Sequence, residues 1–370
     1  MKKKVLIVYG GESVEHDISI ITALQVMMFL PKEYDFVPVY IDRKNVWWTA
    51  DNLDDKNVYT NFDKNVKKKR QVFLVNGEKV LYVKKKNHLF PMCEVLSVLN
   101  CCHGRFGEDG CLQGVLAGCD IPQTSPGVTT SAICMDKAFL KDVMFHAGID
   151  TPQYVCICKD EVEKTDFSKI VRKMKFPLVV KPANLGSSIG VSVCKDEKEL
   201  ETAGSFAFEF DRKVIVEECI CNLREFNCAV FEYRKNVFCS DVSEVTQMGE
   251  VYSFADKYLS SATFDKKVEK RLEKKIKSVS ERAYKIMGCG GVVRIDFLYD
   301  EKERKLFLNE INTIPGALAF YLFKDIKFSE LIKCLIEESI ARNEREKTFV
   351  KTYKSDALKV FREAEIRRKK

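Results

Sequence analysis

The 370-residue sequence predicts an α/β domain followed by two smaller α+β regions. Residues 1–42 alternate strand, helix and strand, an order typical of a parallel α/β sheet. Farther along, an apolar strand leads into a glycine- and serine-rich loop and a second strand. Near the C-terminal end, two apolar segments form a predicted antiparallel hairpin. These three patterns organise the chain and locate its polar residues.

The N-terminal domain is predicted over residues 1–125. "KKKVLIVYGG" is a predicted buried strand, and "SVEHDISIITALQVMMFLP" a helix capped by Ser13. "DFVPVYID" is the next strand, and "QVFLVNGEKVLYV" predicts a hairpin around Asn76-Gly77. "EVLSVLNCCHG" predicts another buried strand, followed by a helix through "CLQGVLAGCDI".

The following two domains are predicted over residues 126–216 and 217–345, with a charged tail at 346–370. "SAICMDKAFLKDVMFHAGI" favours one helix ending at Gly148. The strands "FPLVVKPA" and "VSVCK", a helix and the strand "KVIVEECI" complete the first of these domains. The second contains strands in "REFNCAVFEY" and "NVFCSDVSEV", a charged helix from about Lys266 to Met287, and the hairpin "GVVRIDFLYDEKERKLFLNEIN". The tail is interpreted as a solvated helix.

Composition excludes several classes of protein. Hydrophobic residues make up 46% and charged residues 31%, as in ordinary globular proteins. The net charge of +7 is modest, and the absence of a Lys/Arg run interleaved with aromatics argues against nucleic-acid binding. No run is long enough to span a membrane, so no membrane partner is expected.

The fifteen cysteines are interpreted as reduced core residues of a cytoplasmic protein. The apolar run in "MKKKVLIVYGG" is too short for a signal peptide, and most cysteines lie in apolar, strand-like segments without a CxxC pair.

The C-terminal hairpin carries the strongest sign of chemistry. Side chains alternate along a strand, so Arg294 shares a face with Asp296, and Glu310 shares one with Asn312. If Asp296 pairs with Glu310, four polar groups converge, together with Leu298 and Leu308 on the same faces. Two acids and an amide oxygen are ligands for a hard cation such as Mg²⁺. An ordinary ion pair between Arg294 and one acid is the equal alternative.

Three other segments have both a functional and a plain structural interpretation. Lys181 leaves a buried strand before the loop 186–190, which could close over phosphates or be a simple turn. The acids of "VIVEECI" could hold an adenine amino group or merely reach solvent. Glu15 at a helix start more often compensates the helix dipole than binds a ligand. His103 lies in the glycine-rich segment "HGRFGEDG".

The order of these motifs resembles one family. "YGGESVEHDIS", "HGRFGEDGCLQG", "MDK", "VVKPANLGSSIGVS", "VIVEECI", "REFNCAV", "VRIDF" and "LNEINTIPG" together resemble the D-alanine–D-alanine ligases of the ATP-grasp superfamily, from about Lys4 to Phe323. The resemblance implies a Rossmann-like, pre-ATP-grasp domain followed by a two-lobed ATP-grasp domain. It also implies ATP-dependent joining of two D-alanine molecules through an acyl phosphate, for peptidoglycan precursors, and a homodimer.

The resemblance also implies an ATP site. Two lysines match those that hold the phosphates, a loop serine lies over them, the end of "VIVEECI" matches the adenine hinge, and a later acid matches the ribose contact. These expected ATP-binding residues are Lys137, Lys181, Ser188, Glu217, Glu218, Cys219, Ile220, Glu225 and Lys257.

The expected metal ligands are Asp296, Glu310 and Asn312, for two Mg²⁺ ions, with Mn²⁺ as an alternative. The groups that the family uses in catalysis match Glu15, which receives the ammonium of the first substrate, Ser187 in the loop, and Arg294 and the Gly316 amide, which stabilise the oxyanion.

The expected substrate-binding residues are His103, Tyr258, Tyr321 and Leu322, and the partners are small amino acids. Tyr258 belongs with Lys257 to a loop that closes the site in the family. The ligases usually carry a serine followed by leucine or methionine where Tyr321-Leu322 stands, and the serine helps to hold the carboxylate of the second D-alanine. The departure leaves D-serine, D-lactate or another amino acid open as second substrate.

Two rival functions are less well supported. A nucleotide-binding regulatory or scaffold protein without turnover is disfavoured, because the matched phosphate and metal residues are all present. A biotin-dependent carboxylase is disfavoured because "GGESVEHDIS" resembles an amino-acid-binding segment.

Overall fold

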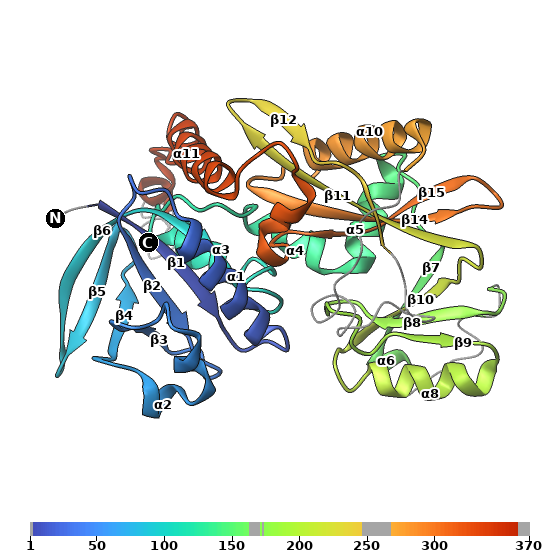
Figure 1. Ribbon diagram of the computed structural model, residues 1–370, viewed down its shortest axis with the longest axis horizontal. Coiled ribbons are helices and arrows are strands. Elements are labelled where there is room, and N and C mark those ends of the chain that lie inside the picture. Colours follow the sequence, from blue (N-terminus) through green and yellow to red (C-terminus); the bar gives the residue numbers. More distant parts are fainter. Residues whose placement is uncertain (1–2, 163–170, 172–173, 246–267, 362–370) are drawn as a thin grey trace, which may run out of the picture.

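The computed structural model describes residues 3–162, 171, 174–245 and 268–361. Three sheets organise this part of the chain (Figure 1): a closed N-terminal sheet at the left, a central sheet at the lower right and a C-terminal sheet at the upper right. The predicted α/β and α+β composition is therefore confirmed.

The N-terminal sheet closes on itself in the order β1-β2-β3-β4-β5-β6. Its first strand pairs in parallel with β2 and β6, as the strand–helix–strand order predicted, whereas the remaining pairs are antiparallel. The elements here are β1 (Lys3–Gly10), α1 (His16–Phe29), β2 (Phe36–Ile41), β3 (Trp47–Thr49), η1 (Lys56–Thr60), α2 (Phe62–Asn65), β4 (Arg70–Leu74), β5 (Val80–Lys85), β6 (His88–Asn100) and α3 (Cys111–Gly118).

Two helix predictions need correction. Ser13 does not cap α1, which begins at His16; instead the Ser13 hydroxyl accepts a hydrogen bond from the Glu15 amide over 3.1 Å. The predicted single helix ending at Gly148 is two helices, α4 (Val128–Met135) and α5 (Lys137–His146). Asp136 has extended backbone angles between them, and its carboxylate accepts hydrogen bonds from the amides that begin α5.

The central sheet has the strand order β7-β10-β8-β9 and one helix of eleven residues against it. Its buried side chains include Leu178, Val180, Val214 and Val216, packed against Leu200 of the helix. The elements are β7 (Tyr154–Cys158), α6 (Lys159–Val162), β8 (Leu178–Pro182), β9 (Ser192–Cys194), α8 (Glu197–Ala207) and β10 (Lys213–Glu218).

The C-terminal sheet has the order β12-β11-β14-β15, with β13 paired to β11. The helix α11 (Phe328–Glu346) returns to the N-terminal sheet, so that Leu331 and Leu335 share one core with Val5 and Ile7. The other elements are β11 (Leu223–Tyr233), β12 (Asn236–Cys239), β13 (Ser243–Val245), α10 (Lys270–Ile286), β14 (Val292–Asp300), β15 (Lys305–Asn312) and η2 (Gly316–Leu322).

The hairpin of β14 and β15 has the predicted register at its functional end. Asp296 pairs with Glu310, and Arg294 pairs with Asn312. Directly beyond, the register shifts, so that Phe297 pairs with Leu308 and Asn309 becomes the extra residue of a bulge. Leu308 is consequently buried in the core beneath the sheet, not on the polar face as expected.

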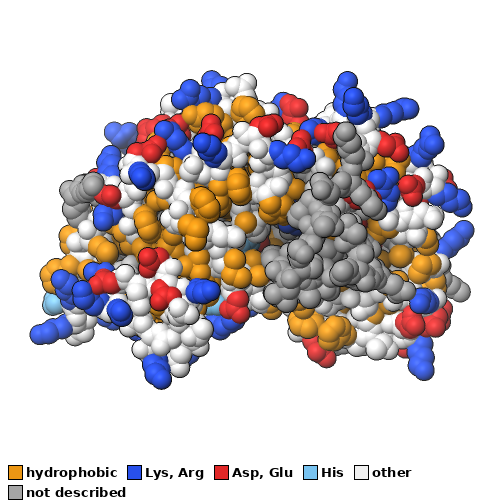
Figure 2. All heavy atoms as spheres, viewed as in Figure 1, with side chains coloured by type: hydrophobic (Ala, Val, Ile, Leu, Met, Phe, Trp, Pro, Cys, Tyr) orange, Lys and Arg blue, Asp and Glu red, His pale blue; other side chains and the backbone are white. Residues whose placement is uncertain are grey.

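The surface carries both signs of charge and one apolar group of side chains. Figure 2 shows Lys and Arg interspersed with Asp and Glu, and hydrophobic side chains gathered where Figure 1 places α1. On α1, Ile21, Met28 and Phe29 are 51%, 76% and 46% exposed. Within the described ranges, no helix has the length and apolar character that a membrane span requires.

Candidate active site

A cavity of about 860 Å³ is lined by residues of the central and C-terminal sheets and of α1. Most of the residues expected to bind ATP, metal or substrate line it. These lining residues are Lys137, Lys181, Ser188, Glu217, Glu218, Cys219, Ile220, Glu225, Arg294, Asp296, Glu310, Gly316 and Tyr321. The tertiary structure thus brings together residues that are up to 184 positions apart, since both Lys137 and Tyr321 line the cavity.

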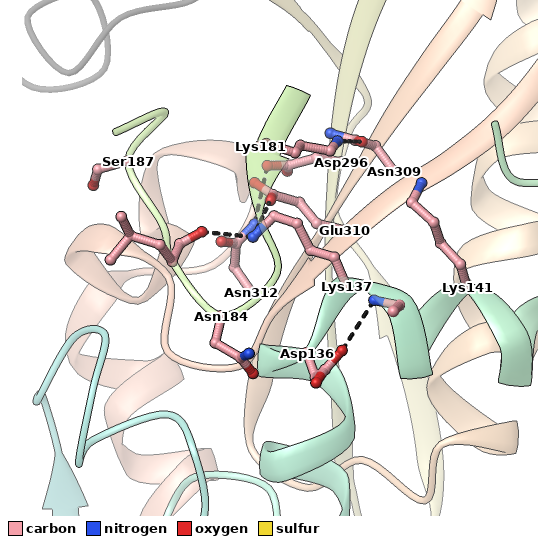
Figure 3. A network of polar contacts seen from close by, with 12 residues as sticks. Asp136, Lys137, Lys141, Lys181, Asn184, Ser187, Asp296, Asn309, Glu310 and Asn312 are labelled. Carbon is pink, nitrogen blue, oxygen red and sulfur yellow. Dashed lines mark hydrogen bonds and ion pairs between the residues drawn. The ribbon is translucent and has the colours of Figure 1, made fainter. Parts of the chain in front are cut away.

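Two lysines bring positive charge to the cavity (Figure 3). Lys137 begins α5, and its Nζ donates to the Leu185 carbonyl over 2.6 Å while lying 3.8 Å from Glu310 Oε2. Lys181 extends from β8, and its Nζ donates to Asn309 Oδ1 over 3.2 Å. Both side chains are nearly buried, at 10% and 9% exposure, so their charges are weakly screened by water.

Behind these lysines, a buried acid lies between two ammonium groups. Glu217 Oε2 is 2.7 Å from Lys181 Nζ, and Glu217 Oε1 is 3.0 Å from Lys141 Nζ. Burial alone would raise the pKa of Glu217, but Lys141 and Lys181 outweigh it and hold that pKa below its usual value. Burial lowers the pKa of Lys141 to about 8, although Glu217 opposes that shift.

The polar end of the hairpin converges on Asp296. Arg294 donates from Nε and Nη2 to the two Asp296 oxygens, each over 2.7 Å. Asn312 donates to Asp296 Oδ2 over 3.0 Å. The Asn227 amide, oriented with its nitrogen toward Asp296, donates to Oδ1 over 3.0 Å. The ion pair between Arg294 and one acid, which the sequence left as the alternative to metal binding, is therefore present.

The donors at this end suit a hard cation. Asp296 and Glu310 are cross-strand neighbours, and Asn312 contributes an amide within contact of Asp296. No group of three or more His, Cys, Asp or Glu residues suited to a metal occurs in the part of the chain that the structure describes. Two carboxylates and an amide oxygen, without sulfur or imidazole, fit Mg²⁺ or Mn²⁺ better than Zn²⁺.

The glycine–serine loop reaches the N-terminal domain. The Ser187 hydroxyl donates to Glu15 Oε1, and both side chains are 6% exposed. A Cβ on Gly186 would lie 3.0 Å from Glu15 Oε2, so a larger residue there would push this carboxylate aside. Ser187 and Ser188 both have a positive φ, which bends the loop toward Glu15.

His103 lies behind the cavity wall and does not line the cavity. Its ring contacts the Thr22 hydroxyl through Nε2 over 2.9 Å, and that hydroxyl accepts the Ala317 amide over 3.2 Å. Burial, together with the charge of Arg294, lowers the pKa of His103 to about 4. The Thr22 hydroxyl therefore links the neutral imidazole to η2.

The segment after Gly316 turns sharply. Ala317, Leu318 and Ala319 all have φ near +50°, a left-handed conformation that is unusual for residues with a Cβ. The turn aims Tyr321, 41% exposed, into the cavity, where its hydroxyl lies 3.3 Å from Arg294 Nη1. Leu322 differs from the expectation, because its side chain is buried in the N-terminal core.

The expected adenine and ribose contacts also line the cavity. Glu218 Oε1 accepts the Gln153 amide over 2.9 Å, and the Cys219 amide donates to the Pro177 carbonyl over 3.3 Å. Glu225 pairs with Val245 and Leu298 across neighbouring strands. Lys257 and Tyr258 lie outside the described residues.

Family models match both halves of the chain. The D-ala D-ala ligase N-terminus matches residues 4–126, and the D-ala D-ala ligase C-terminus matches residues 143–341. The D-alanine–D-alanine ligase of Thermosipho melanesiensis is 37% identical over 349 residues, covering 91% of this chain and 93% of that protein. The enzyme of Caldicellulosiruptor bescii is 35% identical over 363 residues, covering 94% and 98%.

The chain belongs to the D-alanine–D-alanine ligase family.

Solved structures agree with this assignment. The VanG D-Ala:D-Ser ligase from Enterococcus faecalis has a TM-score of 0.79 and 27% identity, covering 92% of this chain and 100% of that one. The D-alanine–D-alanine ligase from Helicobacter pylori has a TM-score of 0.75 and 27% identity, covering 91% and 98%. The family consists of ATP-dependent ligases that act on small amino acids, and this chain is one of them.

Several polar residues of this ligase's site were missed by sequence reasoning. Asn309 reaches Lys181 only because of the bulge, which strand alternation does not reveal. Lys141 follows Lys137 by one helical turn, and that i, i+4 spacing was a usable signal.

Glu108, in "HGRFGEDG", was also missed, although it joins two domains. Its Oε2 accepts the Gly104 amide over 2.7 Å, and its Oε1 accepts the Ile314 amide over 2.9 Å. Burial, followed by the charge of Glu15, raises the pKa of Glu108 to about 8. The Glu108 side chain therefore ties the N-terminal loop to the end of β15, beside the expected metal ligand Asn312.

Proposed function

We propose that this site joins two D-alanine molecules into D-alanyl-D-alanine for peptidoglycan precursor synthesis. The observation that carries the proposal is the convergence of Lys137 and Lys181 with Glu310, Asp296 and Arg294 in one cavity. That combination places cations and a carboxylate pair where an anionic substrate must meet ATP phosphates.

In the first step, a carboxylate oxygen of the first D-alanine attacks the γ-phosphorus of ATP. The bond from that phosphorus to the bridging oxygen breaks, ADP leaves, and an acyl phosphate forms. Lys137 and Lys181 offset the repulsion between the two anions. Glu15, which contacts Ser187, receives the ammonium of the first D-alanine, and Ser187 and Ser188 hold the loop over the phosphates.

Asp296, Glu310 and Asn312 would hold Mg²⁺, with Mn²⁺ as an alternative. The bound ions supply positive charge at the phosphates. The fit rests on the donor set, which is two carboxylates and an amide at one end of the hairpin.

In the second step, the amine nitrogen of the second D-alanine attacks the carbonyl carbon of the acyl phosphate. The carbon–oxygen bond to phosphate then breaks, phosphate leaves, and the amine proton passes to solvent. Arg294 and the Gly316 amide donate to the oxyanion, each contributing about 3 kcal/mol of transition-state stabilisation. Enclosure of the cavity protects the acyl phosphate from water.

The adenosine of ATP is assigned to the part of the cavity next to Lys181. Its adenine lies against Glu217, Glu218, Cys219 and Ile220, and its ribose contacts Glu225, all of which line the cavity. Lys257 and Tyr258 are proposed to close the site from a loop outside the described residues.

The test is a product assay with the purified protein, ATP, Mg²⁺ and D-alanine. We expect ATP-dependent phosphate release together with D-alanyl-D-alanine detected by mass spectrometry. L-alanine is the matched control and should give neither. Phosphate release without the dipeptide, or neither product, contradicts the proposal.

Tyr321 favours a second candidate, the same chemistry with another second substrate. Its hydroxyl lines the cavity 3.3 Å from Arg294, where the family has a serine. D-serine, D-lactate and other amino acids are therefore included in the same assay. A product mass above that of D-alanyl-D-alanine by one oxygen atom would identify D-serine as the acceptor.

We further propose a cytoplasmic homodimer with domains at 1–125, 126–216 and 217–345. A cytoplasmic location follows from the ATP requirement of the family. The exposed side chains of Met28 and Phe29 at the end of α1 support a face between copies. Analytical ultracentrifugation tests this, and Met28→Lys should shift a dimer toward monomer.

A further inference from the structure

Lys141 is a buried cation that no part of the proposed mechanism uses. Its side chain is 0% exposed, and it does not line the cavity. Figure 3 shows Lys137 and Lys141 rising from α5 toward the strands that carry Lys181 and Glu310. The two lysines are one helical turn apart, so that the first reaches the cavity and the second lies behind it.

Glu217 connects Lys141 to the cavity. Its carboxylate is 2% exposed and lies between Lys141 Nζ at 3.0 Å and Lys181 Nζ at 2.7 Å, with one oxygen toward each. Lys181 lines the cavity, and its Nζ also donates to Asn309. The three charges therefore form a line from the protein interior to the site of the phosphates.

The net charge of these three groups depends on Lys141. With Lys141, the three groups carry a net charge of +1, and Lys181 can attract an anion while it contacts Glu217. Without Lys141, Glu217 and Lys181 would neutralise each other as a buried pair. Charges in such a water-poor place interact strongly, so the difference would reach an ATP phosphate.

We propose that Lys141 is a positioning residue, whose ammonium holds the Glu217 carboxylate so that Lys181 stays placed and available for ATP phosphates. The inference rests on the proposed ATP site but concerns residues that the proposed chemistry leaves without a role. Lys141 acts through Glu217 and touches no substrate.

A purely structural ion pair is the competing explanation, and it makes a different prediction. Loss of a structural pair lowers stability without a selective effect on one substrate. Loss of a positioning group weakens ATP binding and leaves amino-acid binding unchanged. The deciding readout is therefore ligand selectivity in folded protein.

The primary experiment measures binding of a non-hydrolysable ATP analogue with Mg²⁺ by calorimetry. Lys141→Met keeps the length of the side chain and removes its charge. We expect its affinity for the analogue to fall more than 10-fold, with the KM for D-alanine changed less than 3-fold. Lys141→Gln, which can still donate to Glu217, is the second variant. Its affinity for the analogue should fall less than that of Lys141→Met. Wild-type affinity in folded Lys141→Met overturns the proposal, as does a loss in Lys141→Gln as large as that in Lys141→Met.

A double-variant comparison tests whether Lys141 acts through Glu217. If it does, Lys141→Met combined with Glu217→Gln should bind the analogue about as weakly as Glu217→Gln alone. Losses that simply add would show that Lys141 acts independently, and would overturn the proposal.

Thr130→Val is the matched structural control. It removes a buried hydrogen bond of 2.7 Å to the Met287 carbonyl, in α4 next to α5. Thr130→Val should lower the unfolding temperature without weakening binding of the ATP analogue. Because analogue binding needs no amino acid, a wild-type protein that binds the analogue but makes no D-alanyl-D-alanine would contradict the proposed function and leave this inference intact.

Discussion

The Arg294 guanidinium donates two hydrogen bonds of 2.7 Å to the two carboxylate oxygens of Asp296, two residues farther along β14. Asn312 donates to the same carboxylate over 3.0 Å. A cation at Asp296 must share this carboxylate with the guanidinium, and Asn312 must present its oxygen in place of its nitrogen. Asp296 is therefore the most direct position at which to test the metal site.

Asp296→Asn is expected to abolish turnover while leaving the fold intact. The variant keeps the size of the side chain but removes a negative charge that a divalent cation requires. Phosphate release should fall at least about 10³-fold, and added Mg²⁺ should not restore it. Glu303→Gln, in the exposed turn of the same hairpin, is the control and should retain full activity. Turnover within 10-fold of wild type in Asp296→Asn contradicts the assigned ligand.

Tyr321 is expected to govern the second substrate. Tyr321→Phe removes the hydroxyl that lies 3.3 Å from Arg294 Nη1 and keeps the ring. Loss of a hydrogen bond to a charged group costs roughly 1.5–3 kcal/mol, so kcat/KM for the acceptor should fall about 10- to 100-fold. Steady-state kinetics with the acceptor varied measure this.

The serine that the family usually carries at position 321 provides the comparison. Tyr321→Ser restores the serine and should favour D-alanine as acceptor over D-serine or D-lactate. If both variants match the wild type for every acceptor, Tyr321 does not contact the second substrate.

Glu108→Gln should loosen the junction of two domains. Above pH 8, where Glu108 is ionised, its carboxylate accepts amides from Gly104 and Ile314, whereas a glutamine side chain must turn its NH₂ group toward one of those donors. An unsatisfied buried donor costs roughly 1–3 kcal/mol. We expect a lower unfolding temperature and a lower kcat, because Ile314 follows the expected metal ligand Asn312 by two residues.

The control for this prediction is a carboxylate that accepts two backbone amides far from the junction. Asp300→Asn removes the charge of the side chain whose Oδ1 accepts the Lys302 and Glu303 amides at the far end of the hairpin. It should lower stability slightly and leave kcat unchanged. Equal effects of Glu108→Gln and Asp300→Asn on kcat would contradict the junction role.

His103 should make stability depend on pH. Its pKa is lowered to about 4 by burial, whereas an unfolded histidine titrates near 6.5. Between these values the unfolded chain binds a proton that the folded protein excludes, so stability falls as pH falls from about 6.5 to 4. The contribution is roughly 2–3 kcal/mol by pH 4.5.

Urea unfolding at pH 7 and pH 4.5 measures this contribution. His103→Gln removes the titrating group, so the variant should lose less of its urea midpoint between the two pH values than the wild type does. Carboxylates titrate in both proteins and cancel in the comparison. Equal pH dependence in the two proteins would show that His103 is protonated without penalty.

Local patterns predicted the polar end of the hairpin correctly. Strand alternation put Arg294 on the face of Asp296 and Glu310 on the face of Asn312, because the two-residue period of a strand needs no information from elsewhere in the chain. The pairing of Asp296 with Glu310, which the sequence left as a condition, is present. The same reasoning failed at Asn309, the bulge residue directly before Glu310. A bulge depends on how the sheet packs, and its effect was to bury Leu308 and turn Asn309 toward Lys181.

Helix boundaries were predicted less well where a side chain caps a helix and ends the one before it. The pattern around Asp136 favoured one helix, since the apolar residues on both sides continue with helical spacing. In the structure, the Asp136 carboxylate caps α5, and its contact with Lys213 of the central sheet fixes the break. Lys213 is distant in sequence, so no local signal reveals this partner.

By itself the sequence determined the chemistry available to this protein. Its order of motifs identified the family, and its spacing placed two acids, an amide and a guanidinium on one strand pair. Only the tertiary structure decided which charges meet: Lys141 with Glu217, Glu108 with Ile314, and Ser187 with Glu15. The physical reason is that covalent spacing fixes neighbours within an element, whereas contacts between elements depend on how the three sheets pack around the cavity.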